Sequence, residues 1–206
     1  RAMGLNDVAP FDIDKKVIGM PVPKGPLVKL TISGFVDEVS RDTPAPGGGS
    51  IAALAGALGS ALASMVVKLS VGKGEFDSKY EELCLLAEKA QTIKDALILA
   101  VDADTEAFNE VIAGMRMAKD TVEQQELRSK AIRAGYKSAA EVPLKTAELC
   151  REVLDLCQAA ANIGNKAVMR DAGVGALMAM AGVQGAIHNV RINLPHTRDD
   201  VFIGRM

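Results

Sequence analysis

The sequence has few aromatic residues, no tryptophan and almost no excess of charge of either sign. Phe and Tyr make up 3% of the 206 residues, and 24 Lys and Arg are balanced by 26 Asp and Glu. Few aromatic side chains are therefore available to stack on nucleic-acid bases, and the chain has no overall positive charge to attract nucleic acid or a membrane surface. Because 49% of the residues are hydrophobic, we expect a core built from aliphatic side chains.

Cysteine and histidine are also scarce, and their spacing forms no metal motif. Cys84, Cys150 and Cys157 make no C-x-x-C unit, and His188 and His196 show no H-E-x-x-H spacing. We therefore expect free thiols, a reducing cytoplasmic compartment and no metal site.

Only one apolar run, residues 51–67, approaches the length of a membrane span. It carries no charge, but it is dominated by Ala, Gly and Ser, which partition into lipid far less than Leu, Ile or Phe. We interpret it as a densely packed internal helix, with a membrane protein as the less favoured alternative.

Helical periodicity dominates from residue 35 onward, and no segment alternates as a strand does. A short helix is expected at 35–39, and long helices at about 50–71, 78–117, 121–161 and 170–193. The predicted fold class is all-α, a bundle of long antiparallel helices.

Two signals lie within the helix expected at 121–161. Thr121 and Gln124 have the spacing of a capping box at its start. Pro143 lies inside it and should bend the helix or split it in two.

The helix expected at 50–71 has a stripe of small residues, Ala52, Gly56, Gly59 and Ala63. Such a stripe lets another helix approach closely, from the same chain or from a second subunit. Long helices in a bundle of this size often leave an apolar face uncovered, so we expect a homodimer.

The most distinctive motif is the run Thr43-Pro44-Ala45-Pro46-Gly47-Gly48-Gly49-Ser50. Its prolines stiffen the approach to the helix, its glycines allow close contact or positive φ, and Ser50 is a good N-cap. Because backbone N–H groups at a helix N-terminus bind anions and polarised carbonyls, this loop is a candidate binding site. A flexible joint is the alternative.

Three carboxylates, Asp102, Asp104 and Glu106, lie within five residues of a mostly apolar helix. Asp102 and Glu106 share one helix face, whereas Asp104 shares a different face with Phe108. The pattern by itself favours a solvated acidic face over a proton-transfer site.

Further candidate polar residues lie at the two ends of the last helix. Asp171 precedes an apolar stretch, where a carboxylate either caps the helix or serves a site. Asn189 and Asn193 share one face and could orient a flat polar heterocycle through paired donor and acceptor bonds. His188 is interpreted as structural, because no Ser or Cys nucleophile pattern accompanies it.

Five motifs, taken in order, resemble the cyclodeaminase/cyclohydrolase family of folate enzymes. They are the loop at 43–50 with its small-residue helix, Asp102 to Phe108, Val142-Pro143-Leu144, Asn165 to Val174, and Asn189 to Leu194. The resemblance spans about residues 32–206. It implies an all-α dimer that binds folate near the subunit interface and uses no metal.

The resemblance also implies a reaction, the closure of formiminotetrahydrofolate to methenyltetrahydrofolate with loss of ammonia. This is a lyase reaction of one-carbon metabolism and histidine degradation. By the same resemblance, Asp102 or Asp104 transfers the proton, residues 47–50 bind through their backbone, and Asp171 and Asn193 contact the pterin ring. The alternatives are a methenyltetrahydrofolate cyclohydrolase and, in another class, a non-catalytic helical dimerisation module.

Residues 1–30 differ from the rest, because Pro10, Pro21, Pro23 and Pro26 interrupt short apolar pieces. We expect a linker there, and by resemblance the tail of a preceding formimidoyltransferase domain. The helical domain is expected at 31–206, as part of a longer bifunctional chain.

Overall fold

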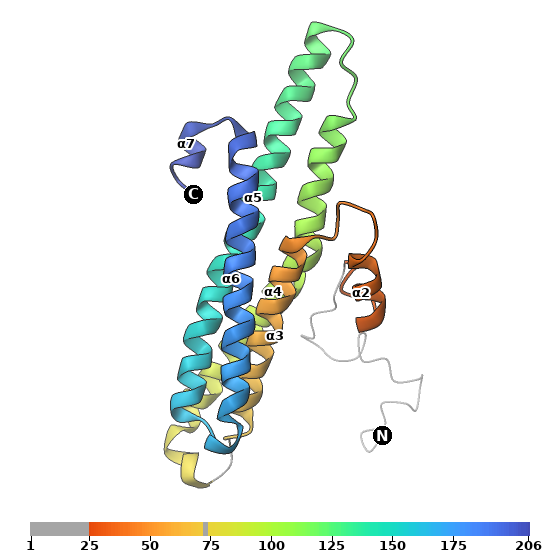
Figure 1. Cartoon of the computed structure of the whole chain (residues 1–206). Helices are drawn as coiled ribbons and strands as arrows, with labels where there is room; N and C mark the ends of the chain where they lie inside the picture. Colours follow the sequence, from red (N-terminus) through yellow and green to blue (C-terminus); the bar gives the residue numbers. More distant parts are fainter. Residues whose placement is uncertain (1–24, 72–73) are drawn as a thin grey trace, which may run out of the picture.

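The computed structural model describes residues 25–71 and 74–206, and within these ranges it contains helices and no strand. Four long helices run alternately up and down, α3 (Gly48–Lys68), α4 (Tyr80–Met115), α5 (Val122–Ile163) and α6 (Met169–Thr197) (Figure 1). The shorter helices are α2 (Ile32–Val39), η1 (Gly74–Lys79), η2 (Lys166–Val168) and α7 (Asp200–Ile203). The predicted all-α bundle of antiparallel helices is confirmed.

Small residues let α3 lie unusually close to its neighbours. A Cβ atom added to Gly59 would lie 2.6 Å from the backbone oxygen of Gly175 on α6, and one added to Gly182 would lie 2.9 Å from that of Ala52. The predicted small-residue stripe of α3 therefore packs against a helix of the same chain.

The core between these helices is aliphatic, as the composition predicts. Its largest cluster includes Ile93, Leu97 and Val153 together with Cys150 and Cys157. All three cysteines are free, and burial raises the pKa of the Cys150 and Cys157 thiols to about 11. These two thiols therefore stay protonated and act as packing groups.

α3 has the length and apolar composition of a membrane span, yet 67% of its most apolar stretch is buried inside the bundle. That burial is typical of the core helix of a soluble protein. It agrees with our interpretation of residues 51–67 as a packed internal helix.

Pro143 does not split α5, which continues for 42 residues from the predicted capping box at Thr121. A proline inside a helix leaves the carbonyl four residues earlier without its usual N–H donor. Here that carbonyl belongs to Ala139, and it accepts a hydrogen bond of 2.7 Å from Nδ2 of Asn193. A side chain of α6 thus replaces the missing backbone donor, so the helix continues.

The helix expected at 170–193 is longer than predicted, because α6 continues through Pro195 to Thr197. The hydroxyl of Thr197 donates to the Leu194 oxygen at 2.7 Å, which closes the last turn. Arg198 then ends the helix in the left-handed conformation, with φ 50° and ψ 40°. The extra turn carries His196.

Most of the linker predicted at 1–30 lies outside the described residues. Of its described part, Leu27 and Val28 pack against Phe35 of α2 and Val101 of α4. The side chain of Thr31 caps α2, which begins three residues earlier than the helix expected at 35–39.

Candidate active site

α4, α5 and α6 all extend past the N-terminal end of α3, so the upper part of the bundle has three helices instead of four (Figure 1). A cavity of about 290 Å³ lies beside the start of α3. Its walls come from four parts of the chain: Pro44, Ala45, Gly47, Gly48, Asp104, Phe108, Tyr136, Ala139, Asn189, Ile192, Asn193 and His196. The glycine-rich loop, one of the predicted acids and both predicted amides therefore meet in one place.

The start of α3 differs from the prediction at Ser50. The N-cap is Gly47, which has extended backbone angles and no capping side chain, and Ser50 lies inside the first turn. Ser50 is fully buried, with its hydroxyl 2.8 Å from the Val101 oxygen and 3.3 Å from Oδ2 of Asp104. The prediction of a Ser50 N-cap is wrong, because the two preceding glycines take helical angles themselves.

The glycines of this loop serve close approach rather than a left-handed backbone. A Cβ atom on Gly49 would overlap the carboxylate of Asp104, and one on Gly48 would lie 3.3 Å from Nδ2 of Asn189. Both residues belong to α3, and Gly47 has a φ of −127°. The absence of side chains therefore brings the helix N-terminus against Asp104.

Asp104 is the one carboxylate among the cavity's lining residues, and it is partly buried. Burial raises its pKa above the ordinary value, and hydrogen bonds from the side chain and backbone of Ser50 offset part of that rise. A carboxyl group with a raised pKa exchanges a proton more readily near neutral pH than an ordinary one.

Asp102 lies outside the cavity and has a different environment. It is 6% exposed, and its Oδ1 accepts a hydrogen bond from Leu27 N at 2.8 Å, while Oδ2 accepts one from Val28 N at 3.3 Å. A Cβ atom on Gly25 would overlap the same carboxylate. Asp102 therefore holds residues 25–28 against α4, and Glu106 is exposed to solvent.

The two asparagines are held by their amide nitrogens. Nδ2 of Asn189 donates to the Gly185 oxygen at 2.8 Å, and Nδ2 of Asn193 donates to the Ala139 oxygen that Pro143 leaves free. Neither Oδ1 atom has a hydrogen-bond partner among the residues that the structure describes. Both amides can therefore accept hydrogen bonds from N–H groups of a ligand.

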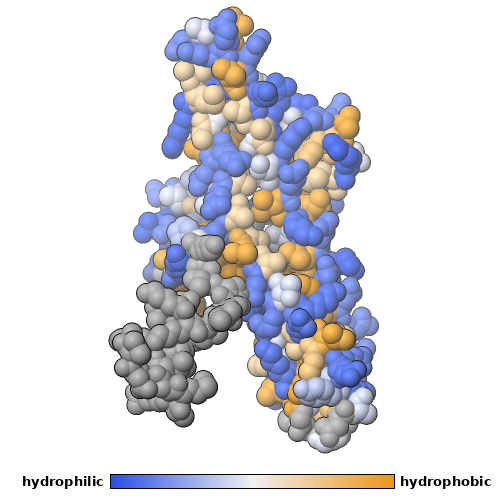
Figure 2. Space-filling view, turned by 180° about the vertical axis from the view of Figure 1, so that it is seen from behind, coloured by the Kyte–Doolittle hydropathy of each residue, from blue (hydrophilic) through white to orange (hydrophobic). Residues whose placement is uncertain are grey.

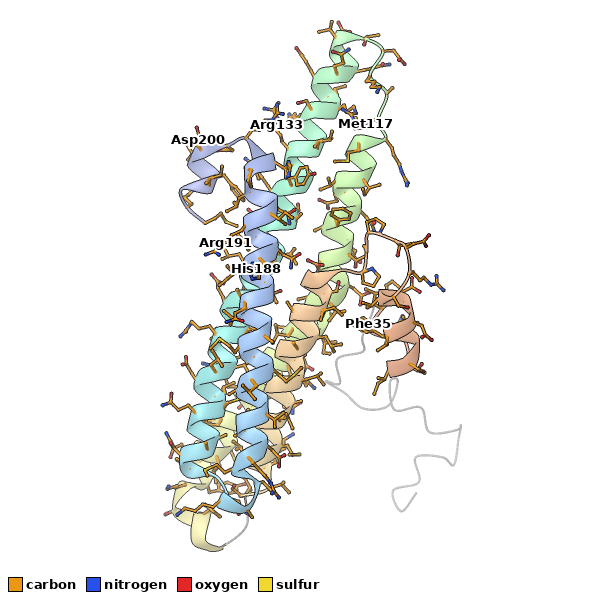
Figure 3. The ribbon with its side chains drawn as sticks, viewed as in Figure 1. Phe35, Met117, Arg133, His188, Arg191 and Asp200 are labelled. Carbon is orange, nitrogen blue, oxygen red and sulfur yellow. The ribbon has the colours of Figure 1, made fainter. Side chains whose placement is uncertain are left out.

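Asp171 and His188 are not brought to this cavity. Asp171 lies in the first turn of α6, 18 positions before Asn189, which is about 27 Å along a helix. That position suits the favourable interaction of a carboxylate with a helix N-terminus. His188 and Arg191 are labelled on α6 in Figure 3; both are exposed, and neither lines the cavity.

The ring side chains of Tyr136 and His196 also line the cavity, and neither residue was predicted from the sequence as a site residue. His196 follows Asn193 by three positions and Asn189 by seven, which places all three on one helix face. The signal was present, but we expected the helix to end before Pro195. Phe108 follows Asp104 by four positions and was recognised only as sharing its face.

Known proteins resemble this chain over most of its length. The sequence profile of a family described as formiminotransferase-cyclodeaminase matches residues 31–206. The formimidoyltransferase-cyclodeaminase of Mus musculus is 38% identical over 204 residues, which cover 97% of this chain and 38% of the mouse protein. The chain thus spans less than half the length of that relative.

Two further proteins are similar to this chain over most of their own length. A methenyltetrahydrofolate cyclohydrolase of Methylorubrum extorquens is 38% identical over 172 residues, covering 84% of this chain and 83% of that protein. The crystal structure of a formiminotetrahydrofolate cyclodeaminase from Thermotoga maritima superimposes with a TM-score of 0.77 at 25% identity, covering 86% of this chain and 84% of that one.

Proposed function

Because the chain belongs to the formiminotransferase-cyclodeaminase family, we propose that its cavity binds a reduced folate and that Asp104 transfers protons there. The proposed reaction is cyclisation of formiminotetrahydrofolate to methenyltetrahydrofolate with release of ammonia. The observation that carries the proposal is the position of Asp104, a partly buried carboxyl group with a raised pKa beside the glycine-rich start of α3.

One carboxylate is sufficient for the proton transfers of this reaction. The substrate's formimino group enters as a protonated amidine, and the second folate nitrogen attacks its carbon to form a new C–N bond. Asp104 takes the proton from the attacking nitrogen and gives it to the amino group, which leaves as ammonia when its C–N bond breaks. The methenyl product keeps the positive charge, which the ionised Asp104 stabilises.

Asn189 and Asn193 support a pterin as the bound ring. A reduced pterin presents ring and exocyclic N–H donors, and both side chains line the cavity with amide oxygens that have no partner among the described residues. The N–H groups at the start of α3 supply donors beside Asn189 and Asp104, because Gly48 lies against the first of these side chains and Gly49 against the second.

The test is to mix the protein with formiminotetrahydrofolate and to follow methenyltetrahydrofolate absorbance and ammonia in parallel. Equal and rapid formation of both products is the expected result. The cyclohydrolase relative makes hydrolysis of methenyltetrahydrofolate the second candidate, so the same preparation is tested for it. Folded protein without either activity would overturn the enzymatic proposal in favour of a non-catalytic dimerisation module.

We also propose that two copies of the chain form a homodimer in a reducing, cytoplasmic compartment. Ile51, Leu58 and Met65 recur every seven residues on α3 and are 39%, 48% and 38% exposed, and Leu177 on α6 is 72% exposed. Figure 2 shows hydrophobic residues scattered among hydrophilic ones on one face of the molecule. Sedimentation should give a dimer, and Leu58→Lys should give a monomer with unchanged helical content.

A further inference from the structure

Ring side chains are rare in this protein, and the cavity collects a disproportionate share of them. The sequence has five Phe, two Tyr and two His. Of these nine, Phe108, Tyr136 and His196 line the same cavity. They come from three different helices, α4, α5 and α6, so their meeting depends on the tertiary fold.

Two of these rings form a stack. The ring centroids of Tyr136 and His196 are 4.5 Å apart, and the ring planes are inclined by 23°. Offset stacking at this distance is a favourable arrangement for aromatic pairs. The pair joins α5 to the last turn of α6, the turn that exists because α6 continues through Pro195.

The environment of the pair differs from that of a core aromatic. His196 is exposed and Tyr136 is half-buried, whereas Phe35 and Phe202 are buried. No hydrogen bond from the ring of His196 reaches a residue in the described part of the chain. An exposed stack contributes little to the core, yet it gives one cavity a flat, polarisable wall.

We propose that the Tyr136–His196 stack is the surface on which the conjugated ring of the substrate lies. The inference rests on the proposed function, because it takes the ligand to be a reduced folate. The stack would bind the flat pterin half of that molecule while the amide oxygens of Asn189 and Asn193 meet its N–H groups. The glutamate chain of the folate has no ring to stack, and the proposal places the aminobenzoyl ring away from the pair.

The chain provides matched controls for both residues. Its other tyrosine, Tyr80, and its other histidine, His188, are exposed and lie outside the cavity. Tyr136→Ala and His196→Ala are therefore compared with Tyr80→Ala and His188→Ala. Tyr136→Phe and His196→Phe keep a ring at each position.

The experiment measures dissociation constants by calorimetry for tetrahydrofolate, for 6-methyltetrahydropterin and for 4-aminobenzoylglutamate. The first probe is the whole ligand, and the others are its ring half and its tail half. Tyr136→Ala and His196→Ala should weaken binding of the whole ligand and of the ring half by about 5- to 100-fold, the range for losing one stacking partner. The affinity of these Ala variants for the tail half should stay within about 3-fold of that of the original protein. The Phe variants and both control variants should bind all three probes with affinities within about 3-fold of the original.

Three outcomes overturn the inference. If the original protein binds tetrahydrofolate but both Ala variants bind it equally well, the stack is not a binding surface, and the proposed function stands. If the Ala variants lose ring-half and tail-half binding alike together with a lowered melting temperature, the stack only joins α5 to α6. If the original protein binds neither tetrahydrofolate nor its ring half, the stack and the proposed function both fail.

Discussion

Asp102 and Asp104 are separated by one residue on α4, yet they lie in contrasting environments. Both oxygens of Asp102 accept hydrogen bonds from backbone N–H groups of residues 27 and 28, whereas Asp104 lines a cavity beside the buried hydroxyl of Ser50. Two residues turn a helix by about 200°, so the two side chains point to opposite sides. A carboxylate whose oxygens are already bonded fixes structure, whereas one that is desolvated in a cavity can exchange a proton.

The largest effect is expected from Asp104→Asn, which removes the proton carrier and preserves the shape of the side chain. Turnover of formiminotetrahydrofolate should fall by about 10²- to 10⁴-fold, the usual contribution of a general acid–base group. Steady-state kinetics measure the change, and circular dichroism verifies that the helices are intact. An Asp104→Asn enzyme within about 3-fold of the original rate would remove Asp104 from the mechanism.

The second effect concerns the backbone that lies against Asp104. Gly49→Ala adds a methyl group where the Asp104 carboxylate now lies, so the carboxylate must move. A displacement of about 1 Å is enough to lower turnover by about 10²-fold. Gly173→Ala on α6 is the matched control, because a Cβ atom there would have no neighbour within 4 Å. Equal rates in the two variants would contradict the close-approach role of Gly49.

The third effect is on stability and belongs to Asp102. Asp102→Ala leaves the buried N–H of Leu27 without an acceptor and releases residues 25–28, which should cost about 1–3 kcal/mol in the free energy of unfolding. Urea denaturation measures it, with Asp104→Ala as the comparison. If Asp104→Ala destabilised the protein more than Asp102→Ala, the two assignments would have to be exchanged.

The smallest effect is the pH dependence of stability that Asp104 imposes. Its raised pKa means that the folded protein keeps this proton to higher pH than the unfolded chain does. Stability should therefore fall as pH rises from the ordinary carboxyl pKa through the raised one, and Asp104→Asn should lack this loss. Urea unfolding of both proteins from about pH 4 to about pH 7 should give a difference that grows in favour of the variant. A difference of the opposite sign would mean that the ionised form is the stabilised one.

The sequence predicts the fold well, because helical periodicity and caps are local signals. The capping box at Thr121 and the long antiparallel helices are confirmed, with ends that differ by a few residues. Pro143 was expected to bend its helix or split it in two, and the last helix was expected to end before Pro195. α5 is not split, because Asn193 of α6 donates a hydrogen bond to the Ala139 oxygen, and helix propensity contains no information about that partner. α6 continues through Pro195, and the hydroxyl of Thr197 closes its last turn by donating to the Leu194 oxygen.

The site is only partly predictable for a related reason. The glycine loop, Asp104, Asn189 and Asn193 were chosen from local motifs and from the family resemblance, and the structure brings them together. The different environment of Asp102 depends on residues 25–28 crossing α4, a contact between segments about 75 residues apart. Tyr136 and His196 meet only because α5 and α6 pack side by side. A local sequence pattern cannot predict that contact between the two helices.

The most direct test compares Asp102→Asn and Asp104→Asn for turnover and unfolding in one set of preparations. Our account predicts that Asp104→Asn loses most of its activity and none of its stability, whereas Asp102→Asn loses stability and keeps a rate within about tenfold of the original. A folded Asp102→Asn enzyme as inactive as Asp104→Asn would contradict the claim that only one of the two carboxylates transfers protons.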